Sequence, residues 1–135
     1  TARLATAVRA ALALSKSRTP AILYIEDDPA LTDVIPQILA GVGELYVARS
    51  VAEGRALLAA QTFDLALLDL VLPDGSGLEL IPLLNANKPG GVPILVFSAH
   101  DLPPEYAKQV TGSLLKTQTP NDTLLASVRT LLSHL

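Results

Sequence analysis

The sequence predicts an α/β fold, namely a doubly wound sheet of five parallel strands with helices on both faces. Short apolar runs alternate five times with helical stretches from Ala21 onward. The run Leu65 to Leu68 has no polar break, which is typical of a strand buried on both faces. The loops between these elements are short, and right-handed crossovers then leave few topologies for such a chain.

The composition fits one domain with a substantial core. Of the 135 residues, 50% are hydrophobic and 17% are charged, which argues against disorder. The net charge of −3 argues against a nucleic-acid-binding surface. No apolar run approaches the ~18 residues of a membrane helix, so we expect no membrane contact by this domain. The chain has no cysteine, which is compatible with a cytoplasmic location.

Residues 1–19 are expected to form an additional helix or linker, and residues 20–135 the main domain. Leu4, Val8 and Leu12 fall on one helical stripe. Two interpretations stay open for this helix: it packs on the domain, or it is a connector or dimerising helix from an upstream module. Because the chain begins without methionine, we expect a piece of a longer protein.

Five strands are expected from the apolar runs and from the turn residues that bound them. The expected strands are, in chain order, 21–25, 44–48, 63–69, 93–97 and 113–115. Each is followed by a helical stretch. The expected helices span about 28–40, 50–60, 76–86, 103–110 and 119–132.

The helix starts carry recognisable caps. Asp28 is expected to cap the first of these helices, with Pro29 in its first turn. Ser50 and Ser76 each precede a glutamate by three residues, which is the capping-box spacing. The segment 119–122 is expected to cap the last helix. Pro36 and Pro82 lie inside the first and third helices, where they predict kinks.

Polar residues follow four of the five expected strands at their carboxyl ends. They are Glu26, Asp27 and Asp28 after the first strand, Asp69 at the end of the third, Ser98 after the fourth and Lys116 after the fifth. Open α/β sheets bind their ligands at this edge, where the strand order reverses. We therefore expect these side chains to form one site.

The residue types at this edge suit phosphoryl transfer. Carboxylates placed close together repel one another, and a hard cation such as Mg²⁺ with its oxygen ligands removes the conflict. Lys116 supplies a positive charge and Ser98 a hydroxyl donor. A carboxylate nucleophile, a metal, a lysine and a hydroxyl together can stabilise a phosphoryl group in transfer, with Asp69 as the nucleophile.

With these motifs in order, residues 21–135 resemble the receiver domains of two-component response regulators. The motifs are EDD after the first strand, DLVLPDGSG around Asp69, FSA with Ser98, and Lys116 after the fifth strand. The resemblance implies a flavodoxin-like (βα)5 fold with strand order 2-1-3-4-5. It also implies a partner, a histidine kinase or a histidine phosphotransfer protein, whose phosphohistidine supplies the phosphoryl group. The KTQTP stretch is similar to receivers of hybrid sensor kinases.

The resemblance assigns a role to each site residue. It implies that Asp69 accepts the phosphoryl group while Ser98 and Lys116 contact its oxygens, in a domain that catalyses only its own phosphorylation and dephosphorylation. For Mg²⁺ it implies Asp27 and Asp69 as ligands, Glu26 acting through water, and the backbone carbonyl of Val71. We interpret Asp28 mainly as the helix cap.

The sequence departs from the family pattern at two positions. Ser113 stands where an aromatic residue is usual, and Thr117 follows the lysine where a cis-proline is common. These departures keep open a degenerate receiver that binds partners without phosphorylation. An aspartyl-phosphate phosphatase is disfavoured, because Val71 stands where such enzymes place a second aspartate. Apolar Val71 also predicts a long-lived phosphorylated state, unless His100, interpreted mainly as a loop residue, positions water instead.

Overall fold

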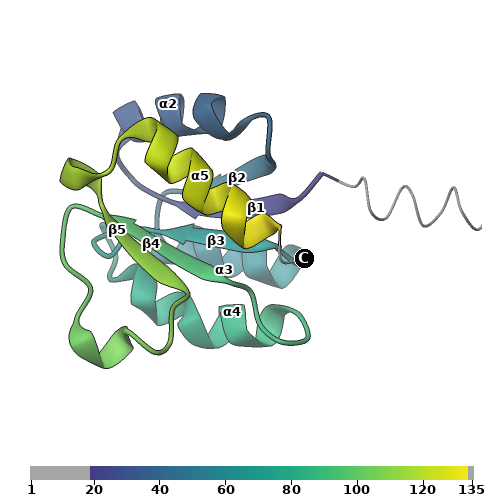
Figure 1. Cartoon of the computed structure of the whole chain (residues 1–135). Helices are drawn as coiled ribbons and strands as arrows, with labels where there is room; N and C mark the ends of the chain where they lie inside the picture. Colours follow the sequence, from purple (N-terminus) through teal and green to yellow (C-terminus); the bar gives the residue numbers. More distant parts are fainter. Residues whose placement is uncertain (1–18, 134–135) are drawn as a thin grey trace, which may run out of the picture.

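The computed structural model describes residues 19–133, which build a five-stranded sheet between two helical layers (Figure 1). All strands pair in parallel, in the order β2-β1-β3-β4-β5. The predicted fold class and strand order are therefore confirmed. The strands are β1 Ala21–Ile25, β2 Glu44–Ala48, β3 Leu65–Leu68, β4 Ile94–Ser98 and β5 Gly112–Leu115.

Four α-helices are present in the described residues, two on each face of the sheet. They are α2 Pro29–Leu39, α3 Val51–Ala60, α4 Ile81–Asn87 and α5 Asn121–Leu132. Helices α2 and α5 pack on one face, and α3 and α4 on the other (Figure 1). Three single turns of 3-10 helix accompany them, at Gly77–Leu80, Pro104–Tyr106 and Lys116–Gln118.

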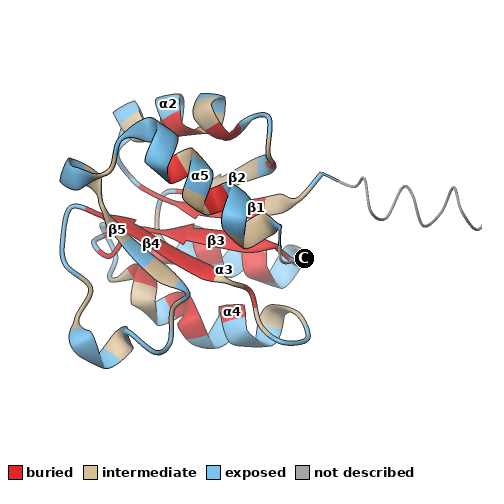
Figure 2. Cartoon of the chain, in the orientation of Figure 1, coloured by how far each residue is buried: buried red, intermediate tan, exposed pale blue. Residues whose placement is uncertain are grey.

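Alternating side chains along the central strands form two separate apolar cores. On β1, Leu23 and Ile25 pack toward α3 and α4, whereas Ile22 and Tyr24 pack toward α2 and α5. Strands β3 and β4 are buried along their whole length (Figure 2). The unbroken apolar run in β3 is thus explained by helices on both of its faces.

The prediction of the third helix, over 76–86, is wrong for the first half of that range. The chain forms a 3-10 turn over Gly77–Leu80, and the α-helix begins only at Ile81. Pro82 consequently lies in the first turn of α4 rather than inside a longer helix. No helical hydrogen bond is lost there, because the first backbone N–H groups of a helix have no partner within it. The kink expected at Pro82 is therefore replaced by a helix start, whereas Pro36 does lie inside α2.

The helix expected over 103–110 is much shorter in the structure. Only Pro104–Tyr106 is helical, and its hydrogen bonds join residues three apart: Tyr106 N donates to Pro103 O at 3.0 Å and Ala107 N to Pro104 O at 3.1 Å. Tyr106 and Val110 pack against the core but are only half-buried, and the other side chains of this segment are exposed or half-buried.

Three of the four expected caps are present. Asp28 accepts a hydrogen bond from Ala30 N at 3.0 Å, Ser50 from Glu53 N at 3.1 Å and Ser76 from Leu78 N at 3.1 Å. The cap expected from 119–122 is wrong, because α5 has Pro120 at its N-cap, without a side-chain bond. The Thr119 hydroxyl instead donates to Leu115 O at 2.7 Å.

The helix predicted within residues 1–19 lies almost wholly outside the described residues. Within the described part of the chain, no helix is both long and apolar enough to cross a membrane.

Candidate functional site

The carboxyl edge of the sheet brings the predicted polar residues together. Glu26 follows β1 directly, and its N–H still donates to Ala48 O at 2.9 Å, as in a continuing strand. Asp69 follows β3 in the same way, with its N–H donating to Ile25 O at 3.0 Å. Ser98 is the last residue of β4 and Lys116 the first residue after β5. The site is therefore fixed by sheet pairing.

Asp69 is held by hydrogen bonds on both carboxylate oxygens. Ser98 Oγ donates to Oδ1 at 2.7 Å, and Leu70 N donates to the same atom at 2.7 Å. Lys116 Nζ donates to Oδ2 at 3.0 Å. Asp69 is only 6% exposed and Ser98 is fully buried. The carboxylate thus has a fixed orientation, with a neutral donor on one side and a cation on the other.

Lys116 also forms an ion pair with Glu26. Its Nζ lies 2.5 Å from Glu26 Oε1, so one ammonium group contacts two buried carboxylates. Glu26 Oε2 accepts a hydrogen bond from Asp28 N at 3.2 Å. Nζ of Lys116 further lies 5.9 Å from the centre of the Phe97 ring, within reach of a cation–π contact.

The two carboxyls have shifted pKa values of opposite direction. Burial acts to raise the pKa of Asp69, but hydrogen bonds from Ser98 and Lys116 outweigh it, so the pKa is lowered. Burial also raises the pKa of Glu26, and here the Lys116 ammonium only partly offsets it. The pKa of Lys116 is raised, because its bonds to the two carboxylates outweigh its burial. Asp69 is therefore ionised and facing a protonated lysine at neutral pH.

Asp27 completes a cluster of three carboxylates. One oxygen each of Glu26, Asp27 and Asp69 lies within 4.8 Å of the others, with Asp27 exposed and the other two buried. Carboxylate oxygens at this spacing, open to water on one side, fit a hard cation that keeps part of its hydration shell. The predicted acidic residues are thus brought together in a form that suits Mg²⁺. The Val71 side chain is 54% exposed, directed away from the apolar core.

The loop after Asp69 is fixed by two glycines. Leu72 and Gly75 exchange backbone hydrogen bonds of 2.9 and 3.3 Å, and Gly75 has a φ of 149°, which favours glycine. A Cβ on Gly77 would collide with the backbone carbonyl oxygen of Asp69. Only glycine therefore allows the chain to pass so close behind the site.

Asp74 in this loop has a function that the sequence analysis missed. Its carboxylate accepts hydrogen bonds from Val51 N at 2.8 Å and Ala52 N at 3.0 Å, at the N-terminus of α3. These bonds lower the pKa of Asp74. Because 23 residues separate Asp74 from Val51, no local capping pattern reveals the contact.

The two departures from the family pattern have visible consequences. Ser113 is exposed and lines a cavity of about 330 Å³ together with residues of the loop after β4, among them His100. The Lys116–Thr117 peptide bond is trans, since the described residues contain no cis bond. His100 is exposed, and its backbone N–H donates to Ser98 Oγ at 3.3 Å.

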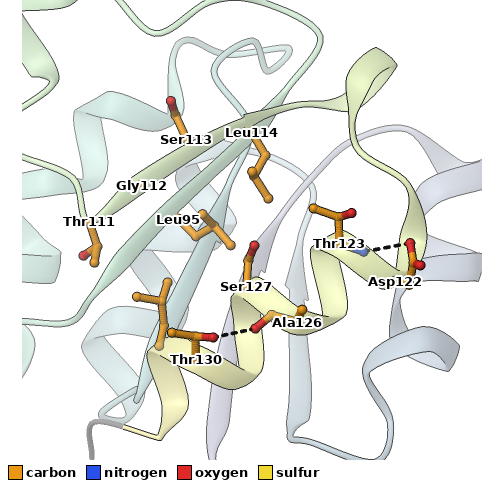
Figure 3. Close-up of a pocket in the computed structure, with 11 residues that line it drawn as sticks. Leu95, Thr111, Gly112, Ser113, Leu114, Asp122, Thr123, Ala126, Ser127 and Thr130 are labelled. Carbon is orange, nitrogen blue, oxygen red and sulfur yellow. Dashed lines mark hydrogen bonds between the residues drawn. The ribbon is translucent and has the colours of Figure 1, made fainter.

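A larger groove of about 610 Å³ lies between β5 and α5 (Figure 3). Its rim includes Asp122, whose carboxylate accepts from Thr123 N at 3.0 Å, and Thr130, whose hydroxyl donates to Ala126 O at 2.9 Å. Both side chains are thus engaged with the backbone of their own helix. Neither Asp69 nor Lys116 lines this groove, so the chemistry of the carboxylates is not located there.

The fold and the acidic edge together define a receiver domain of two-component signalling. Residues 22–123 match the family of response regulator receiver domains. This match covers most of the chain, and the chain belongs to this family. Receiver domains are generally not enzymes, and they bind Mg²⁺ at an acidic pocket.

Relatives and solved structures agree with the assignment. The chain is 38% identical over 80 residues to the response regulator protein PilR of Pseudomonas aeruginosa, covering 58% of this chain and 18% of PilR. It thus spans about a fifth of that relative. A receiver domain from Methanospirillum hungatei matches with a TM-score of 0.75 and 26% identity, covering 86% of this chain and 95% of that one.

A third similar protein was solved in a modified state. It is a response regulator from Burkholderia pseudomallei with a phosphorylated aspartic acid, calcium ion and citrate. Its TM-score is 0.68 and its identity 26%, covering 85% of this chain and 69% of that one.

Proposed function

We propose that the chain is a phosphoacceptor domain that takes a phosphoryl group onto Asp69 from the phosphohistidine of a histidine kinase or a phosphotransfer protein. The observation that carries the proposal is the state of Asp69. It is a buried, ionised carboxylate that accepts hydrogen bonds from Ser98 and Lys116 and lies beside two further acids. The related Burkholderia protein, with its phosphorylated aspartic acid, supports this use of the site.

The residues have distinct parts in the transfer. A carboxylate oxygen of Asp69 forms a bond to phosphorus while the bond from phosphorus to the donor's imidazole nitrogen breaks, and the imidazole leaves with the electron pair. Lys116 and Ser98 then turn from the carboxylate to the phosphoryl oxygens, where negative charge has to be stabilised. Burial of Asp69 keeps competing water away from its carbonyl carbon.

Asp27, Asp69 and, through water, Glu26 would hold Mg²⁺, with the backbone carbonyl of Val71 as a further ligand. Their carboxylate oxygens are already gathered within 4.8 Å. Bound there, the metal supplies positive charge against the phosphoryl oxygens. The chain's own contribution is to hold these oxygens in place before the metal arrives.

The phosphorylated state is proposed to switch a protein-binding surface. Ser98 Oγ joins two parts of the molecule, since it donates to Asp69 and accepts from His100 N. When Ser98 turns toward the phosphoryl group, the loop after β4 loses its present anchor. The cavity beside Ser113 leaves room for that loop to rearrange without an aromatic side chain.

Substitution of the acceptor tests the proposal. The wild-type chain, incubated with acetyl phosphate and Mg²⁺, should gain the mass of one phosphoryl group, and Asp69→Asn should gain none. The control Asp101→Asn changes an exposed aspartate near the site and should label like the wild type. Labelling of Asp69→Asn to the wild-type level would exclude Asp69 as the acceptor.

The alternative is a degenerate receiver that binds partners without phosphorylation, and the departures at Ser113 and Thr117 favour it. The phosphoryl mimic beryllofluoride distinguishes the two. For a functional receiver it should bind in the presence of Mg²⁺ and shift the amide resonances of the segments that follow β4 and β5. Unchanged spectra would favour the degenerate receiver. Turnover of a generic phosphate ester would instead indicate the phosphatase.

A further inference from the structure

Two buried side-chain atoms among the described residues are poorly satisfied, and they are a donor and an acceptor. Tyr24 Oη has no hydrogen-bond partner, and Glu26 Oε1 has only the ion pair with Lys116; both residues are 1% exposed. Buried polar atoms are nearly always hydrogen-bonded, and leaving one unbonded costs stability. A buried phenol hydroxyl with no partner therefore calls for an explanation.

Tyr24 and Glu26 lie on the same face of the sheet. They are two residues apart in an extended segment, because Glu26 N continues the β1–β2 ladder by donating to Ala48 O at 2.9 Å. Tyr24 packs in the core between the sheet and helices α2 and α5, together with Phe97. The ammonium group of Lys116, which pairs with Glu26, also lies over the Phe97 ring.

The strand geometry places the hydroxyl on the face of the sheet that also carries Glu26. Burial raises the pKa of Tyr24, and the nearby negative charges of Glu26 and Asp69 raise it further. A neutral phenol hydroxyl can donate a hydrogen bond to a carboxylate. Glu26 Oε1 meanwhile depends on Lys116, whose single ammonium group it shares with Asp69.

This shared arrangement cannot persist once Asp69 carries a phosphoryl group. The phosphoryl oxygens add negative charge that competes for the Lys116 ammonium. Glu26 Oε1 would then remain buried without a donor, which is costly for a carboxylate. Tyr24 Oη is a donor without an acceptor in the same region, so one new hydrogen bond satisfies both atoms.

We propose that Tyr24 is a positioning residue for Glu26: its hydroxyl donates a hydrogen bond to the Glu26 carboxylate when Lys116 turns from Glu26 to the phosphoryl group. The inference rests on the proposed function, because it concerns the phosphorylated state of Asp69. Tyr24 keeps Glu26 oriented toward the metal side of the site and does not contact the phosphoryl group itself.

Tyr24→Phe removes only the hydroxyl and separates this role from packing. Without ligands, the variant should be at least as stable as the wild type in thermal unfolding, because it loses an unsatisfied buried group. With saturating Mg²⁺, its dissociation constant for beryllofluoride, measured by calorimetry, should rise roughly tenfold, as for one lost hydrogen bond to a charged group. Tyr46→Phe makes the same change on β2, in the opposite core, and should leave the constant unchanged.

The possible results lead to different conclusions. If Tyr24→Phe binds beryllofluoride as tightly as the wild type, the positioning role is wrong, whatever the unfolding temperature. If the wild type itself fails to bind beryllofluoride with Mg²⁺, the proposed function fails first and the inference with it.

A second measurement covers the case in which Tyr24→Phe does not fold. It follows, in the wild type, the NMR resonance of the Tyr24 ring carbon that bears the hydroxyl. This resonance should shift on addition of Mg²⁺ and beryllofluoride, and an unmoved resonance would overturn the proposal.

Discussion

At the scale of single residues, one lysine serves two acids of unequal strength. Lys116 contacts Asp69, whose pKa is lowered, and Glu26, whose pKa is raised. The difference follows from the donors available to each. Asp69 receives bonds from Ser98 and from the backbone in addition to the lysine, whereas Glu26 Oε1 has the lysine alone among the described residues. Glu26 is thus the acid that gains most from a metal ion.

Glu26→Gln should stabilise the protein at neutral pH in the absence of divalent cations. The folded-state pKa of Glu26 lies above its unfolded value, so its contribution to stability is fully present below the unfolded pKa and is lost as pH rises through the folded pKa. Glutamine does not ionise, so the variant lacks this loss of stability with rising pH. We expect a gain in the free energy of unfolding at neutral pH, which disappears on acidification.

Urea unfolding at a series of pH values measures this difference. Added Mg²⁺ should reverse the order of the two proteins, because the wild-type carboxylate gains a cation and the amide does not. Asp33→Asn, at an exposed position on α2, is the control and should show neither effect. A Glu26→Gln protein that is less stable than the wild type at every pH, with or without Mg²⁺, would contradict the assigned pKa direction.

The apolar side chain of Val71 leads us to expect a long lifetime for the phosphorylated state. Its side chain is exposed, lies two residues after Asp69 and has no group that could orient water. Val71→Asn should therefore shorten the half-life of the phosphoryl group several-fold, measured as loss of the added mass after removal of the phosphodonor. His100→Ala, changed separately, should leave the half-life as it is. A shorter half-life in wild type than in His100→Ala would show that His100 positions the water instead.

At the scale of elements, the N-terminus of α3 is joined to the loop that carries Asp69. Ser50 caps Glu53 N, and Asp74 binds the N–H groups of Val51 and Ala52. Negative charge at a helix N-terminus is favourable, because the free N–H groups carry partial positive charge. The loop after β3 is thereby fixed to a second element as well as to the sheet.

Asp74→Ala should increase hydrogen exchange at Val51 and Ala52 and lower the stability of the domain. The pKa of Asp74 is lowered in the folded state, so its contribution is present above the unfolded pKa and is lost as pH falls through the folded pKa. The exchange difference should accordingly shrink in acid. Glu105→Ala, at an exposed position in the 3-10 turn Pro104–Tyr106, is the control. Unchanged protection at both amides in Asp74→Ala would exclude the capping role.

These elements also show how far the sequence could be interpreted. The strands and the caps of Asp28, Ser50 and Ser76 were predictable, because alternation, burial and capping are local signals. The start of α4 at Ile81 was not, since a 3-10 turn and an α-helix share the same apolar spacing over one turn. Asp74 was missed because its contact is long-range. The gathering of Glu26, Asp69, Ser98 and Lys116 was predictable, because parallel strands end at one edge. The contact of one Lys116 ammonium with both carboxylates was not, because it depends on side-chain conformations that the strand pattern does not determine.

At the scale of the whole molecule, the site exists only when the sheet is complete. Glu26, Asp69, Ser98 and Lys116 follow or end four different strands, β1, β3, β4 and β5. The two apolar cores hold these strands in register from both faces.

Ligand binding at the edge should therefore stabilise the entire fold. Mg²⁺ with beryllofluoride at a hundred times its dissociation constant should raise the unfolding free energy by about 2.7 kcal/mol.

The same architecture predicts that residues 20–135 form an independent domain. Within the described range 19–133, both faces of the sheet are covered by helices. A chain lacking residues 1–18 should therefore keep its unfolding free energy within about 0.5 kcal/mol and its affinity for beryllofluoride.

The same truncation tests dimerisation. If residues 1–19 dimerise, light scattering after gel filtration should detect a dimer for the full chain and a monomer for the truncated one. Loss of cooperative unfolding on truncation would show that the N-terminal segment is part of the domain.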